Sequence, residues 1–115
     1  MGNIQLTARM KIHDGKAKLF KELAVQCMLI VKEKEKANTL QYDWFYNKDE
    51  TEFVVRETYA NSDAVLAHMG NVGELLGKMS AISDLSAEFY GDLSSDLRLA
   101  IAPFNAKVYS LFQGL

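Results

Sequence analysis

Glu57, Tyr59 and His68 are the side chains of this sequence whose types and spacing most directly suggest chemistry. Residues 53–59 read FVVRETY, and in a β-strand the two-residue period places Glu57 and Tyr59 on one face beside apolar neighbours. A carboxyl group in apolar surroundings has a raised pKa and can act as a base. A structural role is favoured for this pair over catalysis; in it, Glu57 pairs with a Lys, an Arg or a buried hydroxyl and Tyr59 fills the core.

His68 follows these residues on a segment with helical spacing. It comes four positions after Ala64 and three after Val65, so all three side chains share one stripe of a helix that would cover the strand. A neutral imidazole can remove or relay the proton of a phenol near pH 7. The alternative is a core histidine that is hydrogen-bonded to Glu57, Tyr59 or a backbone carbonyl.

Aromatic side chains on the expected neighbouring strand would complete a pocket around these groups. Tyr42 and Trp44 alternate within residues 39–46, and Phe53 shares the face of Glu57 by the period of two. Flat aromatic ligands bind between such side chains. We therefore predict Tyr42, Trp44 and Phe53 as substrate-binding residues.

Other kinds of site find little support in the sequence. His13 and His68 are far apart and have neither a cysteine partner nor the spacing of a metal-binding helix. Cys27 has apolar neighbours, which favours a buried, inert thiol. Gly77-Lys78 is followed by Met79 where a phosphate-binding loop needs Ser or Thr. We predict no metal and no cofactor.

Composition narrows the class of protein. The chain has 115 residues, of which 49% are hydrophobic and 24% charged, with a net charge of -2. These values predict a single domain over residues 1–115. Without a basic stretch we expect no nucleic-acid partner. Without a long apolar run or a signal-peptide pattern we expect no membrane span and a cytoplasmic location.

Apolar periodicity predicts an α+β fold in the order β-α-β-β-α-β with an appended α-β, which is the ferredoxin-like arrangement. Gly70 is expected to end the second helix, and the charged residues 32–36 are expected to be solvated. Because strands carry apolar residues on both faces, for example Phe45 opposite Trp44, the sheet face without helices should be apolar and bury against a second copy. The expected elements are strands at 4–12, 39–46, 53–59, 84–90 and 104–112, and helices at 16–36, 61–70, 73–79 and 94–102.

Residues 38–79 resemble the antibiotic biosynthesis monooxygenase domain family. The resemblance rests on Leu40-Gln41-Tyr42, Asn47-Lys48-Asp49, the strand from Phe53 to Tyr59, and Ser62-x-Ala64-x-x-x-His68. It implies a homodimeric α+β barrel in which two sheets meet face to face. Family members include cofactor-independent oxygenases of quinols and anthrone-like polyphenols, haem-degrading proteins, and others without an assigned activity.

The resemblance also bears on the activity. Haem-degrading relatives use an Asn, a Trp and a His, but here Tyr59 stands at the position of that Trp and residues 75–79 contain no His. Haem degradation is therefore disfavoured. The favoured hypothesis is a cofactor-independent monooxygenase of a quinol or polycyclic phenol, with His68 as the base and Glu57 and Tyr59 beside it. The alternatives are a non-catalytic dimer that binds a small aromatic molecule, and an interaction module whose pocket is filled by its own side chains.

Overall fold

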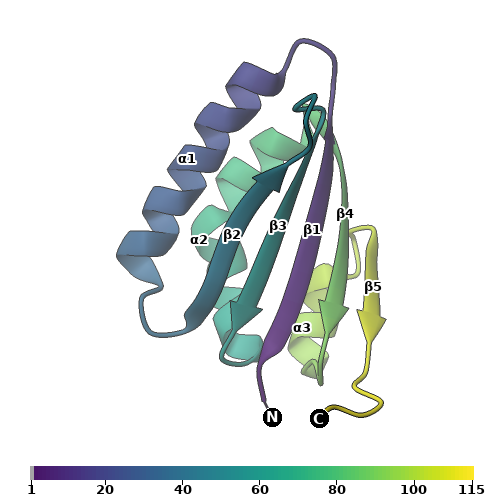
Figure 1. Ribbon diagram of the computed structural model, residues 1–115. Helices are drawn as coiled ribbons and strands as arrows, with labels where there is room; N and C mark the ends of the chain where they lie inside the picture. Colours follow the sequence, from purple (N-terminus) through teal and green to yellow (C-terminus); the bar gives the residue numbers. More distant parts are fainter. Residues whose placement is uncertain (1) are drawn as a thin grey trace.

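The computed structural model describes residues 2–115 as a five-stranded sheet with three helices on one face (Figure 1). The α+β class and the β-α-β-β-α-β order with an appended α-β are confirmed. The elements are β1 (Ile4–Ile12), α1 (Ala17–Lys34), β2 (Thr39–Tyr46), β3 (Glu52–Tyr59), α2 (Ser62–Ser80), β4 (Ser83–Tyr90), α3 (Ser95–Ile101) and β5 (Ala106–Tyr109).

The strands lie in the order β2-β3-β1-β4-β5, and all neighbours are antiparallel except β4 and β5. On the central strand β1, Leu6 lies opposite Glu57 of β3 and Phe89 of β4. The expected alternation holds on β3, where Phe53, Val55, Glu57 and Tyr59 are all buried under the helices. The sheet therefore presents Glu57 to the space beneath α2.

Helix α2 is longer than predicted. Gly70 does not end it, and the segment 73–79 continues the same helix to Ser80. Glycine disfavours a helix interior by about 1 kcal/mol, but the buried stripe that includes Val65, Val72 and Met79 packs against the core and outweighs this cost. The glycines are not sites of close packing, because a Cβ atom at Gly70, Gly73 or Gly77 would meet nothing within 4 Å.

Side-chain caps mark where helices α2 and α3 begin. The Asn61 side chain accepts a hydrogen bond from the Ala64 backbone N–H at 2.9 Å and starts α2. Ser94 caps α3 in the same way through the Leu97 N–H at 3.1 Å.

Strand β5 is shorter than the predicted 104–112, because only residues 106–109 pair with β4. None of the helices in residues 2–115 has the length and apolar character needed to cross a membrane.

The sheet face without helices is not the apolar surface that was predicted. Its aromatic side chains, Phe45, Tyr90 and Tyr109, lie on β2, β4 and β5, while β1 and β3 carry Arg9 and Arg56 on this face. Tyr90 stacks on Tyr109 with ring centroids 5.5 Å apart. The prediction failed because most outward positions of β1 and β3 are polar, with Val54 as an apolar exception opposite Arg9 and Phe45.

Candidate functional site

A cavity of about 90 Å³ lies between the sheet and the helices. About 10–15 Å³ of such volume holds one water molecule, so the cavity has room for several waters or for part of a ligand. Small side chains on the sheet explain it, since Ala8 pairs with Ala87 on β4 and with Val55 on β3. Its lining includes members of both core clusters, for example Cys27 and Val72 from one and Leu6 and Phe89 from the other.

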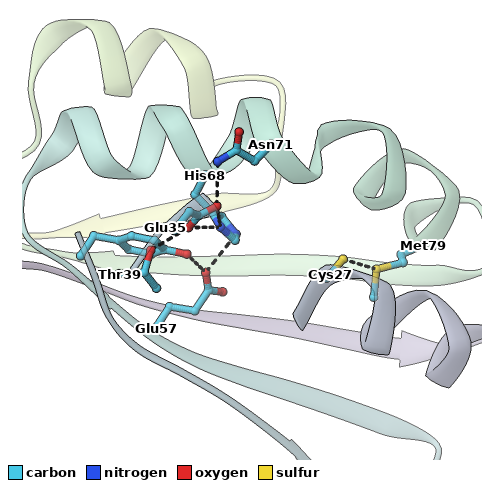
Figure 2. A network of polar contacts seen from close by, with 8 residues as sticks. Cys27, Glu35, Thr39, Glu57, His68, Asn71 and Met79 are labelled. Atoms are coloured by element: carbon cyan, nitrogen blue, oxygen red, sulfur yellow. Dashed lines mark hydrogen bonds and ion pairs between the residues drawn. The ribbon is translucent and has the colours of Figure 1, made fainter. Parts of the chain in front are cut away.

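His68 reaches this cavity from the buried face of α2 and is only 7% exposed. Its Nδ1 lies 3.0 Å from Oε1 and 3.1 Å from Oε2 of Glu35, and its Nε2 lies 3.6 Å from Oε1 of Glu57 (Figure 2). One imidazole is thus placed between two carboxyl groups that come from different elements. Both interpretations made from the sequence, a core histidine and a pocket base, predicted an inward-facing side chain.

Glu35 is the functional candidate that the sequence interpretation missed. It was expected to be solvated within the charged run 32–36, but it is 7% exposed. Thr39 Oγ1 donates to its Oε1 at 2.6 Å and Asn71 Nδ2 donates to its Oε2 at 3.1 Å (Figure 2). The available signal was the buried stripe of α1, whose spacing from Cys27 through Val31 leads to Glu35 four residues later.

The contacts of Glu35 fix which nitrogen of His68 carries the proton. An ionised carboxylate only accepts hydrogen bonds, and Glu35 receives them from Thr39 and Asn71. The Nδ1 of His68 therefore donates to Glu35, which leaves the lone pair on Nε2. At 3.6 Å, the approach of Nε2 to Glu57 is longer than a hydrogen bond, so this lone pair is free to accept a proton.

Glu57 and Tyr59 form a second buried contact beside the imidazole. The hydroxyl of Tyr59 donates to Oε1 of Glu57, and the rings of Tyr59 and His68 have centroids 5.2 Å apart. Tyr59 itself is fully buried and does not line the cavity, whereas Glu57 does. The structure therefore brings Glu57, Tyr59 and His68 together. Tyr59 contacts Glu57 on the side away from the cavity.

Burial sets the charge of this cluster. Loss of hydration raises the pKa of Glu57 from 4.5 to about 8, so Glu57 is largely protonated at neutral pH. Burial also lowers the pKa of His68, although Glu35 opposes this. The phenol pKa values of Tyr59 and Tyr42 rise, chiefly through burial. The ground state therefore combines a neutral imidazole at His68 with a protonated carboxyl group at Glu57.

Two of the three predicted substrate-binding residues line the cavity. Tyr42 and Trp44 do so with ring centroids 5.8 Å apart, and Tyr42 also meets His68 edge-on at 5.2 Å. Phe53 instead packs on Phe20 of α1 at 4.8 Å and is not part of the lining. Phe53 lies two residues nearer the β2–β3 turn than Val55. This position places the Phe53 side chain beside the cavity, in the apolar core.

Sulfur-containing side chains occupy another part of the lining. Cys27 is buried and unbridged, and its Sγ donates to Met79 Sδ at 3.8 Å (Figure 2). Burial raises the pKa of this thiol to about 11, which keeps it protonated. Across residues 2–115, no three His, Cys, Asp or Glu side chains are grouped in a way that could hold a metal ion.

The charge state of Glu57 predicts how stability depends on pH. Between pH 6.5 and 8, unfolded Glu57 is ionised while the folded carboxyl retains its proton. The unfolded state then binds fewer protons, so the free energy of unfolding should fall as pH rises, by about 2 kcal/mol over this interval. Below pH 6.5 the lowered pKa of His68 has the opposite effect on stability, since the unfolded imidazole binds a proton more readily than the folded one.

Urea denaturation at pH 6.5 and pH 8 measures this effect. In Glu57→Gln, the amide replaces the protonated carboxyl and still accepts from Tyr59, so its stability should change little over this range. Equal pH slopes in the two proteins would show that Glu57 is ionised when folded.

Comparisons with known proteins add to this geometry. The family model described as antibiotic biosynthesis monooxygenase matches residues 4–73. MupZ from Pseudomonas fluorescens is similar in structure, with a TM-score of 0.85 at 19% identity, over 100% of this chain and 90% of that chain. No curated protein sequence matches the chain.

Two further solved structures share the fold over most of the chain. A protein from Caulobacter crescentus CB15, provisionally described as an antibiotic biosynthesis monooxygenase, has 26% identity and a TM-score of 0.69, over 76% of this chain and 87% of that one. SnoaB from Streptomyces nogalater, described as a cofactor-independent oxygenase and solved as a point mutant, has 10% identity and a TM-score of 0.67, over 83% of this chain and 97% of that one.

Proposed function

The chain belongs to the antibiotic biosynthesis monooxygenase family, and from this membership we propose that it oxygenates a quinol or a polycyclic phenol without a cofactor. The observation that carries the proposal is His68 in the lining of a largely apolar cavity, with Nδ1 held by Glu35 and with Nε2 at 3.6 Å from Glu57, beyond hydrogen-bond distance. The fold shared with SnoaB, a cofactor-independent oxygenase, supports it.

The chemistry requires little more than a base in a dry pocket. His68 takes a proton from the substrate, and the resulting electron-rich anion can reduce oxygen directly. A C–O bond forms between the substrate carbon and O₂, and the peroxide anion takes the proton back from the His68 imidazolium. The resulting hydroperoxide loses water, with the remaining hydrogen of that carbon, to leave a carbonyl group. For anthrone the balance is C₁₄H₁₀O + O₂ → C₁₄H₈O₂ + H₂O, so the substrate supplies all the electrons.

Each neighbouring group has a role in this scheme. Glu35 orients the imidazole and stabilises the imidazolium that forms when His68 accepts the proton. Protonated Glu57 avoids placing a second negative charge beside the substrate anion, and Tyr59 holds it in place. Tyr42 and Trp44 supply flat walls for an aromatic substrate.

Oxygen uptake by protein purified without added cofactor and assayed with a chelator tests this function. We expect one O₂ consumed per anthrone converted, at a rate well above the spontaneous oxidation. Uptake at the background rate with anthrone and with a panel of quinols would contradict the proposal.

A non-catalytic dimer that binds a small molecule is the second candidate. It is favoured by the position of His68, both of whose ring nitrogens face carboxyl groups, as in a histidine buried for structural reasons. Ligand-induced thermal stabilisation without any oxygen uptake would support this candidate over the monooxygenase.

The family membership supports a homodimer formed through the sheet face without helices. Phe45 is 54% exposed on this mixed polar and aromatic face, and its burial would contribute to such a contact. Sedimentation equilibrium should give twice the chain mass of 12.9 kDa. Phe45→Glu should reduce it to the monomer, whereas the matched control Leu29→Glu on the outer surface of α1, also exposed, should not. A wild-type monomer would refute the dimer.

A further inference from the structure

Trp44 carries the only indole group of the chain. Its side chain lines the cavity, and its Nε1 is buried. In the described residues this is the one buried side-chain nitrogen or oxygen that has no hydrogen-bond partner. Buried polar groups in proteins are nearly always hydrogen-bonded, so the exception calls for a partner that is outside the chain.

The surroundings of Trp44 hold its ring in place. Phe20 contacts it edge-on with centroids 6.3 Å apart, and Tyr42 does so at 5.8 Å. An indole fixed on two sides cannot easily turn its N–H to solvent, and an indole nitrogen only donates. A contact with Trp44 partly opposes the rise in the pKa of Tyr42, so the Tyr42 hydroxyl lies near the indole, but it is not placed to accept a well-aligned hydrogen bond from Nε1. A ligand oxygen in the cavity would supply the acceptor that this geometry lacks.

The lining also restricts the charge of that acceptor. In the part of the chain that the structure describes, the lining residues are mostly apolar and include neither Lys nor Arg. A carboxylate or phosphate brought into such a site would lose its hydration without a compensating cation. A neutral oxygen, such as a carbonyl or hydroxyl group on an aromatic ring, fits the donor and the apolar walls together.

We propose that the Trp44 N–H binds a neutral acceptor oxygen of the ligand at a point remote from His68. Tyr42 lies between the two groups, with its ring 5.8 Å from that of Trp44 and 5.2 Å from that of His68. The oxygen held by Trp44 is thus not the group whose proton His68 removes. This inference rests on the proposed function and assigns Trp44 as the residue that positions the substrate through an oxygen away from the acidic group.

A matched pair of probes tests the donor without any turnover. α-Tetralone and tetralin share a bicyclic skeleton, and only the first has an acceptor oxygen. The single indole of the chain gives a single Nε1–H resonance in a ¹⁵N-correlated spectrum. We expect α-tetralone to move this resonance downfield and tetralin to leave its hydrogen bonding unchanged.

Trp44→Phe keeps an aromatic wall but removes the N–H. It should weaken α-tetralone binding about fivefold relative to tetralin, the value of one neutral hydrogen bond. Ala87→Leu, which fills the cavity floor, should abolish binding of both probes. An unchanged ratio of affinities in Trp44→Phe would show that the N–H bonds only to water, and would overturn the proposal.

Failure of binding by both probes, or binding that survives Ala87→Leu, would also overturn it. The outcome is separable from that of the proposed function, because the probes report binding alone. A protein that consumes no oxygen but discriminates between the probes through Trp44 would support the Trp44 donor and contradict the proposed oxygenase function. Oxygen uptake without discrimination between the probes would support the oxygenase function and contradict the Trp44 donor.

Discussion

Replacing His68 by Asn is expected to lower kcat for oxygen uptake by about 10²–10³-fold, the usual contribution of a general base. The Nε2 lone pair is lost in this variant, and within residues 2–115 no second histidine lines the cavity. The Asn amide nitrogen can occupy the position of Nδ1 and donate to Glu35. The variant therefore removes the base while retaining the contact that stabilises the fold.

The contact retained by Asn makes the comparison with His68→Ala informative. Alanine would leave Glu35 buried with one donor missing, so it should lower the free energy of unfolding by about 1–3 kcal/mol more than Asn does. Near wild-type kcat in a folded His68→Asn protein would remove His68 from the reaction and favour its structural role.

Glu35→Gln should lower kcat by about 10²-fold with little change in KM. A Gln side chain has one acceptor oxygen where the carboxylate has two, and Thr39 and Asn71 compete for it. Its NH₂ group then faces Nδ1 and forces the proton of His68 to Nε2, which is the tautomer that cannot act as the base toward the cavity.

The pH profile distinguishes this positioning role from general destabilisation. Glu35 raises the pKa of His68 against the effect of burial. Removing its charge should lower this pKa further, so the acid limb of kcat/KM should move to lower pH while the plateau falls. Glu33→Gln, an exposed position in the same charged run, is the matched control and should leave both unchanged. An unshifted acid limb in Glu35→Gln would argue against the positioning role.

The fold was largely predictable because its strands and helices carry clear periodicities. In residues 53–59 the structure places every second side chain, from Phe53 to Tyr59, in the core, as the two-residue period of a strand predicts. The length of α2 was not predictable from local rules. Gly70 and Gly73 resemble stop signals, and only the packing of the helix on the sheet keeps it continuous past them.

The site was predictable only in part, for a physical reason. His68, Glu57 and Tyr59 lie near each other in sequence, so their convergence follows from one strand and the adjoining helix. Glu35 comes from the end of α1, and its burial depends on how that end meets α2. A charged residue in a run of charges is normally solvated, and this contact between distant elements is what overrides the rule.

The central claim is that the substrate, once deprotonated by His68, reacts with oxygen with no help from a cofactor. The most direct measurement is mass spectrometry of the product formed from anthrone under ¹⁸O₂ by cofactor-free protein. We predict one ¹⁸O atom in each anthraquinone and the other in water, with His68→Asn forming labelled product only at the background rate. Product formed equally fast by His68→Asn, or lacking the label, would contradict the claim.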